Sequence, residues 1–247
     1  MPREAVLILG GTRDARELAG LLTTRGYKVI TSLAGVTTDP VLPPGEIRRG
    51  GFGGAAGLGD YLARQPVAVV IDATHPFAAR ISGHAHAACE TLGLPLLRLE
   101  RPAWQPSAED NWTTVTDAAA AAAALADGAR VLLTIGRRQL APFFERPGLS
   151  GVIRCIEPPD AAVPPGWRLL RERPPFSLEA EMHLIRGAAI SHVVSKNAGG
   201  APLAAKLLAA RALRIPVIMI ARPHKPETAT AVTAEALAAA VERLLCP

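Results

Sequence analysis

The sequence is poor in cysteine and has no long apolar run. Its three cysteines, Cys89, Cys155 and Cys246, are scattered and form no C-x-x-C pair. That pattern fits neither a disulfide framework nor a zinc site, and it indicates a reducing compartment. No stretch approaches the roughly 20 apolar residues that a membrane span requires, and the apolar run after Glu4 is too short for a signal peptide. We therefore expect a soluble, cytoplasmic protein with no membrane partner.

Aromatic side chains are also scarce, at 4% of the sequence, although the chain carries excess positive charge. The 27 lysines and arginines against 22 acidic residues give a formal net charge of +5, which favours anionic ligands. The basic residues form no dense run, stacking platforms for bases are few, and no basic recognition helix is present. Nucleic acid is therefore not expected as a partner, whereas a small anionic cofactor or a polycarboxylate fits the charge.

Short buried-strand patterns alternate with alanine-rich helical patterns along the chain. The strands are expected at residues 5–9, 29–30, 67–71, 130–134, 192–195 and 216–220, and the helices at 13–25, 55–65, 78–92, 117–127, 177–188, 200–213 and 233–245. Repeated strand-then-helix order predicts an α/β fold with parallel sheets covered by helices on both faces. A proline-containing stretch interrupts the pattern at 98–111. We therefore expect two doubly wound domains, 1–100 and 101–247, with a cleft between them.

The first strand runs directly into Gly10-Gly11-Thr12, and a helical pattern begins at Arg13-Asp14. In this strand–turn–helix order, a glycine turn brings the backbone close to a phosphate, which the helix N-terminus attracts. The G-x-G-x-x-G fingerprint is incomplete, because Thr12 and Ala15 stand where the second and third glycines are expected. The turn predicts a nucleotide cofactor, and an ordinary tight turn is the alternative.

The tip of the second strand carries Ser32 and no acidic residue. An NAD site usually places Asp or Glu there, whereas a 2′-phosphate prefers hydroxyl and arginine partners, so NADP is favoured over NAD. Ser32, Arg13 and the pair Arg48-Arg49 are candidate partners, and the alternative for the pair is a solvated surface. The glycine-rich loop Gly50–Gly54, which includes Gly53, permits close approach to a ligand before the next helix.

Polar residues also follow the strand at 67–71, where Asp72 leads into Thr74 and His75. His75 is a candidate for hydrogen bonding to a cofactor or for donating a proton. Its alternative role is to satisfy the backbone groups of the turn. His84 and His86 are two residues apart, so on a helix they face different directions and cannot share a metal ion. We expect no metal site.

The second half repeats the strand-to-glycine-turn order twice. Gly136-Arg137 follows the strand at 130–134, and Lys196-Asn197 follows the strand at 192–195, with two glycines close behind. A lysine and an asparagine at a strand tip are expected to serve a ligand. Glu179 and Glu181, on the preceding helix, are expected either to orient Lys196 or to face water.

The segments GGTRDAR, GGFGG, DATHPFA, TIGR and SKNAGG, in this order and spacing, resemble the precorrin-6A reductase family of corrin (vitamin B12) biosynthesis. The resemblance spans essentially the whole chain. It implies two Rossmann-like domains with the cofactor in the cleft between them, and NADPH-dependent reduction of one double bond of precorrin-6A to give precorrin-6B. This tetrapyrrole substrate carries acetate and propionate arms, so a positive wall suits it, and Arg137, Lys196 and Arg49 are candidates for that wall.

The expected cofactor-binding residues are Gly10, Gly11, Thr12, Arg13, Asp14, Ser32, Gly53, Thr74, His75, Gly136, Arg137, Lys196 and Asn197. The proton that accompanies the hydride is assigned to Lys196 or His75, with a carboxylic group of the substrate as the alternative. Two other interpretations remain open. One is a cobalt-containing substrate reduced with NADH, and the other is a non-catalytic, two-domain binding protein for a nucleotide-like anion.

Overall fold

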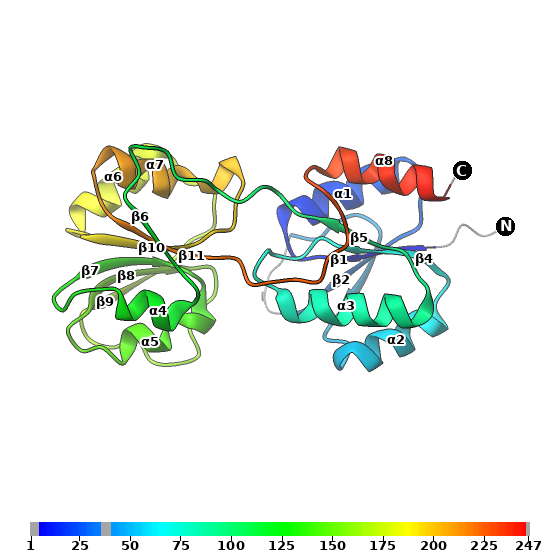
Figure 1. Ribbon diagram of the computed structural model, residues 1–247, viewed down its shortest axis with the longest axis horizontal. Helices are drawn as coiled ribbons and strands as arrows, with labels where there is room; N and C mark the ends of the chain where they lie inside the picture. The colour runs from blue at the N-terminus through cyan, green and yellow to red at the C-terminus, as the bar shows by residue number, and fades with distance from the viewer. Residues whose placement is uncertain (1–4, 36–40, 246–247) are drawn as a thin grey trace. The chain divides into compact units, whose positions relative to one another are not determined.

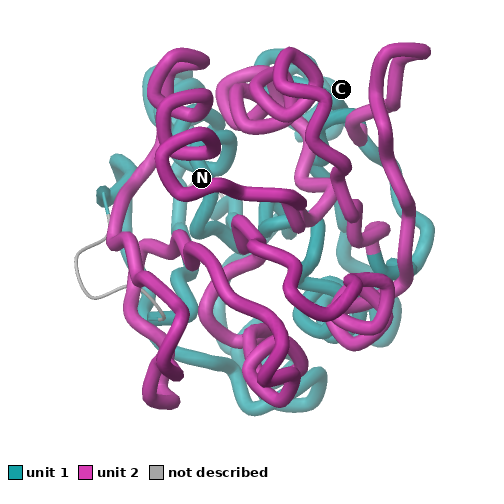
Figure 2. The backbone as a smooth tube through the Cα atoms, turned by 90° about the vertical axis from the view of Figure 1, so that its left-hand side faces the viewer, with its two compact units in different colours: residues 1–102, 223–247 teal, residues 103–222 magenta. Residues whose placement is uncertain are grey.

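The computed structural model describes residues 5–35 and 41–245 and divides the chain into two compact units. Unit 1 comprises the chain up to Pro102 together with the chain from Pro223 onward, and unit 2 comprises Ala103–Arg222 (Figure 2). Within the described residues, Cys89 and Cys155 are buried free thiols. Cys246 lies outside that part of the chain.

Unit 1 is built on a six-stranded parallel sheet with the order β12-β5-β4-β1-β2-β3. Its strands are β1 (Ala5–Leu9), β2 (Val29–Leu33), β3 (Glu46–Arg49), β4 (Val67–Asp72), β5 (Leu96–Leu99) and β12 (Ala229–Ala231). Helices cover both faces (Figure 1), with α1 (Arg13–Thr24) and α8 (Ala234–Leu245) on one and α2 (Gly54–Arg64) and α3 (Ala79–Leu92) on the other. The predicted α/β class is confirmed for this unit.

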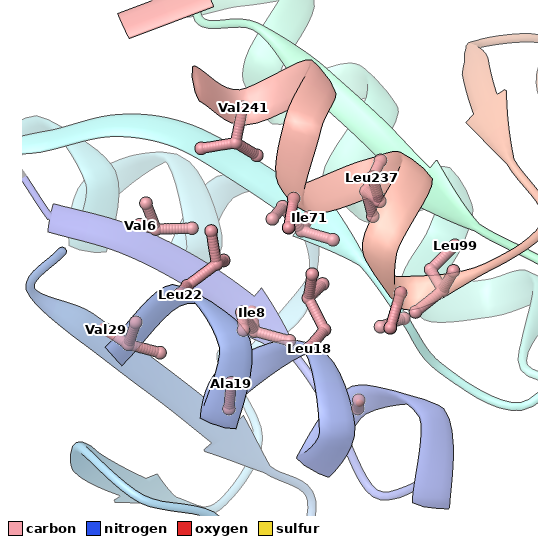
Figure 3. Packing of buried hydrophobic residues seen from close by; sticks show 14 of the residues in the cluster. Val6, Ile8, Leu18, Ala19, Leu22, Val29, Ile71, Leu99, Leu237 and Val241 are labelled. Carbon is pink, nitrogen blue, oxygen red and sulfur yellow. The ribbon is translucent and has the colours of Figure 1, made fainter. Parts of the chain in front are cut away.

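Every residue of β1 is buried, because a central parallel strand is covered on both faces. Val6 and Ile8 pack in the cluster that also contains Leu18 of α1 and Leu237 of α8 (Figure 3), while Leu7 belongs to the cluster under α2 and α3. Replacing a fully buried leucine such as Leu18 with alanine typically costs about 2–5 kcal/mol. This packing fixes where β1 ends, and therefore where its glycine turn lies.

The C-terminal segment differs from the expected domain division, which placed all of 101–247 in the second domain. The chain returns to unit 1 at Pro223, where β12 pairs with β5, with Thr230 opposite Arg98. The apolar face of α8, including Val241, packs against α1. A helical apolar stripe shows that a helix covers a sheet but not which sheet, so the sequence pattern did not reveal this return.

Unit 2 has a second six-stranded parallel sheet with the order β6-β11-β10-β7-β8-β9. Its strands are β6 (Trp112–Val115), β7 (Arg130–Thr134), β8 (Ser150–Cys155), β9 (Trp167–Arg171), β10 (His192–Lys196) and β11 (Val217–Ile220). In Figure 1, α4 (Ala118–Ala123) and α5 (Ala141–Phe144) lie on one face and α6 (Leu178–Gly187) and α7 (Ala205–Ala212) on the other. Two short 3-10 helices, η1 (Arg137–Gln139) and η2 (Ala201–Leu203), follow β7 and β10.

The two sheets share one order of strands. If β7 is matched to β1, then β8, β9, β10 and β11 match β2, β3, β4 and β5, and β6 occupies the edge that β12 holds in unit 1. The order reverses between β1 and β4 in unit 1 and between β7 and β10 in unit 2. Open parallel sheets bind ligands at such switch points, beyond the carboxyl ends of the strands.

All the predicted strands are present, but several others were not predicted. The outer strands β3, β6, β9 and β12 carry mostly exposed or half-buried side chains, so they lack an apolar run. Buried β8 contains Arg154, which interrupts its apolar pattern. The helix expected at 200–213 is divided into η2 and α7. Among the residues that the structure describes, no helix is long and apolar enough to cross a membrane.

Candidate active site

At the switch point of unit 1, the side chain of Thr12 connects the turns that follow β1 and β4. Leu9 of β1 lies beside Asp72 of β4, so the turns after these strands are neighbours. Thr12 Oγ1 donates to the carbonyl of Ala73 at 2.8 Å and accepts from the N–H of Ala15 at 3.0 Å. One hydroxyl therefore caps α1 and joins the two turns.

The glycines before Thr12 bring the backbone close to its neighbours on one side and leave it open on the other. A Cβ on Gly10 would lie 2.8 Å from Cγ2 of Thr31, so a side chain is excluded there. Gly11 is exposed and has φ +106°, and apart from its chain neighbours no described residue places an atom within 4 Å of its Cβ position. Glycine alone adopts such a backbone without strain. The open backbone beside the first turn of α1 fits a pyrophosphate.

The first two residues of α1 have different environments. Arg13 is exposed, whereas the Asp14 carboxylate accepts from Nη1 of Arg101 at 2.6 Å. That ion pair connects the segment after β5, which contains Arg101, to the start of α1. Asp14 therefore has a structural partner, and its predicted contact with a cofactor stays a prediction.

Arg48 organises the tips of β2 and β3. Its Nη1 lies 3.3 Å from Oγ of buried Ser32 and donates to the carbonyl of Gly50 at 2.6 Å, and its Nη2 donates to the carbonyl of Gly51 at 2.9 Å. The guanidinium also lies 3.7 Å from the centroid of the Phe52 ring. The loop is therefore wrapped around one cation, next to the hydroxyl that was expected to meet a 2′-phosphate. Such a cation–π contact adds about 0.5–1 kcal/mol at an exposed site.

Two further candidate residues near Arg48, namely Arg49 and Gly53, are exposed. Arg49 is exposed at the end of β3. This agrees with the alternative that Arg49 is a solvated surface charge. Gly53 is exposed with φ +84° and precedes α2. Its expected contact with a cofactor stays a prediction.

The turn after β4 is fixed by Asp72, whose carboxylate accepts from Thr74 Oγ1 at 2.6 Å and from Nε of Arg98 at 3.2 Å. Thr74 therefore has a structural role at this strand tip. His75 Nδ1 accepts from the backbone N–H of Phe77 at 3.2 Å. The neutral imidazole then carries its proton on Nε2, which suits a donor. The alternative that His75 satisfies backbone groups of its turn is confirmed for Nδ1.

Behind this turn lies a buried network of charges. Nε of Arg98 lies 3.9 Å from Glu100, whose carboxylate lies 3.7 Å from Nζ of Lys225. Nη1 of Arg98 donates to the carbonyl of Pro226 at 2.9 Å. Burial raises the pKa of Asp72, but hydrogen bonds from Ser82 and Thr74 and the charge of Lys225 outweigh it and hold that pKa below its usual value.

The switch point of unit 2 repeats the arrangement of unit 1. Thr134 of β7 lies beside Ser195 of β10, and Thr134 Oγ1 donates to the carbonyl of Val194 at 3.0 Å. Gly136 is exposed with φ +84°. Nη1 of Arg137 donates to the carbonyl of Pro158 at 3.1 Å and to Asp160 at 2.8 Å. Among the residues that the structure describes, the adjacent Nε of Arg137 is buried without a hydrogen-bond partner.

Lys196 ends β10 and is half-buried. Burial lowers the pKa of Lys196 from 10.5 to about 8. A lysine with this pKa exchanges its proton near neutral pH, which is the property that general acid–base chemistry requires.

Asn197 holds the backbone of Trp104. Its Oδ1 accepts from the Trp104 N–H at 2.8 Å, and its Nδ2 donates to the Trp104 carbonyl at 3.0 Å. The side chain that was expected to bind a cofactor therefore has a structural role, and its contact with a cofactor stays a prediction.

Glu181 differs from both alternatives considered for it. It is 2% exposed and therefore does not face water, and its Oε1 accepts from Nη2 of Arg154 at 2.6 Å rather than from Lys196. Lys206 is buried close to this pair. Burial lowers the pKa of Lys206 to about 8, although the negative charge of Glu181 acts in the opposite direction. Glu179 is exposed.

The predicted residues thus form two groups at equivalent strand tips, one in each unit. No sequence pattern pointed to the roles of Trp104, Arg101 or Lys206. Arg98 had a usable signal, because an arginine between two leucines of a buried strand implies a buried acidic partner. Within residues 5–35 and 41–245, no group of three or more potential ligands is arranged to hold a metal ion.

Comparison with known proteins agrees with this geometry. The model of the family described as precorrin-6x reductase CbiJ/CobK matches residues 5–243. Relatives named precorrin-6A reductase from Rhodobacter capsulatus and Rhodococcus erythropolis are each 48% identical over 223 residues, 90% of this chain and 89% and 90% of theirs. A solved structure titled CobK precorrin-6A reductase has a TM-score of 0.92 and 45% identity, covering 98% of this chain and 97% of that one. The chain belongs to the precorrin-6x reductase family.

Proposed function

We propose that this chain reduces one double bond of precorrin-6A with NADPH, giving precorrin-6B in cobalamin biosynthesis. The family match over residues 5–243 supports the reductase activity. One observation carries the choice of cofactor: Ser32, at the tip of β2 where an NAD-specific site would carry an acidic residue, lies 3.3 Å from Nη1 of Arg48 on neighbouring β3. An arginine and a hydroxyl suit a 2′-phosphate, and NADH has none.

The residues of unit 1 fit such a cofactor. The open backbone of Gly11 and the N-terminus of α1 would hold the pyrophosphate, and exposed Arg13 would add a positive charge beside it. Ser32 and Arg48 would hold the 2′-phosphate. NADPH supplies the hydride when bound, while these residues orient it.

The residues of unit 2 fit the macrocycle. Lys196 and Arg137 would bind its carboxylate arms. Reduction adds a hydride to one carbon and a proton to another position. Lys196 or Nε2 of His75 would deliver that proton, with a carboxylic group of the substrate as the other source.

Replacing Lys196 with alanine separates these roles. We expect Lys196→Ala to weaken binding of the macrocycle more than binding of NADPH, as measured by titration of each ligand alone. Equal losses of both affinities would contradict this division.

The overall proposal is tested by initial rates with NADPH and NADH, each on metal-free and cobalt-loaded substrate. We expect NADPH with metal-free precorrin-6A to give the highest kcat/KM. A preference for NADH and cobalt-loaded substrate would instead support the cobalt variant of the reaction. Binding of both ligands without any loss of NADPH absorbance would support a non-catalytic binding protein.

A further inference from the structure

The turn that follows Lys196 is held by two segments outside β10. Asn197 pairs through its amide with both backbone groups of Trp104, at 2.8 and 3.0 Å. The Trp104 indole Nε1 donates to the carbonyl of Gly200 at 3.1 Å, and Nε of Arg222 donates to the carbonyl of Asn197 at 2.9 Å. The turn is therefore fixed near both of its ends by residues that precede β6 and follow β11.

These contacts leave Asn197 little freedom. Its backbone N–H donates to the carbonyl of Ile220 at 2.9 Å, so the residue is hydrogen-bonded through its backbone as well as its side chain. Lys206 contacts the Trp104 ring, with Nζ 4.8 Å from the ring centroid. The same Nζ donates to the carbonyl of Leu203 at 2.8 Å. Because each group is held by the next, releasing one of them loosens the turn.

We infer that Asn197 and Trp104 are positioning residues, which hold Lys196 half-buried at the tip of β10 by clamping the turn that follows it. The relevance of this clamp to the reaction rests on the proposed function, in which Lys196 contacts the substrate. The clamp itself does not depend on that function. If the clamp is released, water reaches Lys196 and its pKa rises toward the ordinary value of a lysine.

The test measures Lys196 without substrate or cofactor. Reductive methylation of the full-length protein is followed across pH by peptide mass spectrometry, with exposed Lys28 as an internal control for reagent and protein. Asn197→Ala removes both bonds to the Trp104 backbone, and Trp104→Phe removes only the bond to Gly200. Trp167→Phe is the matched control, because Trp167 lies on edge strand β9 and its ring packs against Phe144. Circular dichroism confirms that each variant is folded.

We expect the labelling midpoint of Lys196 to lie near pH 8 in the unmodified chain. It should rise by about one pH unit in Asn197→Ala, by less in Trp104→Phe, and not at all in Trp167→Phe. Wild-type midpoints in folded Asn197→Ala and Trp104→Phe would overturn the inference, and Trp104→Phe alone decides it if Asn197→Ala does not fold. A shifted midpoint with unchanged kcat and macrocycle affinity would support the clamp and contradict the role proposed for Lys196.

Discussion

Thr12 Oγ1 donates to the carbonyl of Ala73 at 2.8 Å and thereby joins the turns that follow β1 and β4. The same hydroxyl accepts from the N–H of Ala15 and so caps α1. In unit 2, Thr134, the last residue of β7, donates to the carbonyl of Val194 within β10. In each unit, one threonine therefore connects the two chain segments that flank the switch point. The bond of Thr12 in unit 1 can be tested by mutation.

Replacing Thr12 with valine keeps the shape of the side chain but removes both hydrogen bonds. We expect a loss of about 2 kcal/mol of stability, from the cap and the unpaired carbonyl of Ala73. NADPH affinity should fall about tenfold, because the pyrophosphate turn is no longer held. Thermal unfolding and NADPH titration measure the two effects.

Thr233→Val is the matched control, since Thr233 Oγ1 accepts from the N–H of Ala236 and caps α8 away from the switch point. It should cost about 1 kcal/mol and leave NADPH affinity unchanged. The account fails if Thr12→Val and Thr233→Val affect NADPH affinity alike.

Replacing Arg48 with alanine should reduce the preference for NADPH. Loss of a charge-assisted bond to the 2′-phosphate is worth about 1.5–3 kcal/mol, so kcat/KM with NADPH should fall roughly 10–100-fold. With NADH it should change little. Arg49→Ala, an exposed neighbour on the same strand, should preserve the preference. If both cofactors lose activity equally in Arg48→Ala, the residue serves only the loop that it holds.

Asp72→Asn should destabilise the protein in a way that depends on pH. The pKa of Asp72 in the folded chain lies below its value in the unfolded chain. Its contribution is therefore present in full above the unfolded pKa and is lost as pH falls through the folded one. Breaking its buried pair with Arg98 should cost about 3 kcal/mol at neutral pH.

Urea unfolding of both proteins from neutral pH down to acid pH measures this effect. The difference between Asp72→Asn and the unmodified chain should shrink once the pH falls below the usual carboxyl range. A difference that stays constant throughout would show that Asp72 does not supply the pH dependence.

Lys206→Met tests the buried charge cluster of unit 2. Burial lowers the folded pKa of Lys206 to about 8, below that of the unfolded chain, so the unfolded state binds more protons between these values. The stability of the unmodified chain relative to Lys206→Met should therefore rise with pH above pH 8, by up to about 3 kcal/mol. Unfolding at neutral and alkaline pH measures this change, and Lys28→Met, at an exposed position, should show no such trend.

The sequence predicted β1, β2, β4, β7, β10 and β11 because these buried parallel strands contain short apolar runs, whereas the apolar patterns of the inner strands β5 and β8 are interrupted by Arg98 and Arg154. β7 was expected at 130–134 and is found there. β3 and β12 were not expected, because their exposed residues follow no apolar pattern. The candidate residues were found at the strand tips because ligands of open parallel sheets bind beyond the carboxyl ends of the strands.

The hydrogen-bond partners of those residues could not be predicted from the sequence. Asn197 and Trp104 are 93 residues apart, and Arg98 and Pro226 are 128 apart. Such pairs depend on how the chain crosses between sheets, which spacing and composition do not encode. The return of the chain to unit 1 at Pro223 is an example, since α8 has an apolar stripe that suits either sheet.

The central claim is that this chain transfers a hydride from NADPH directly to the macrocycle. The most direct measurement supplies precorrin-6A with NADPH that carries deuterium at the transferable position of its nicotinamide, and analyses the product by mass spectrometry. We predict one deuterium in each molecule of precorrin-6B and consumption of one NADPH for each product formed. A product without deuterium, or no consumption of NADPH beside bound substrate, would contradict the account.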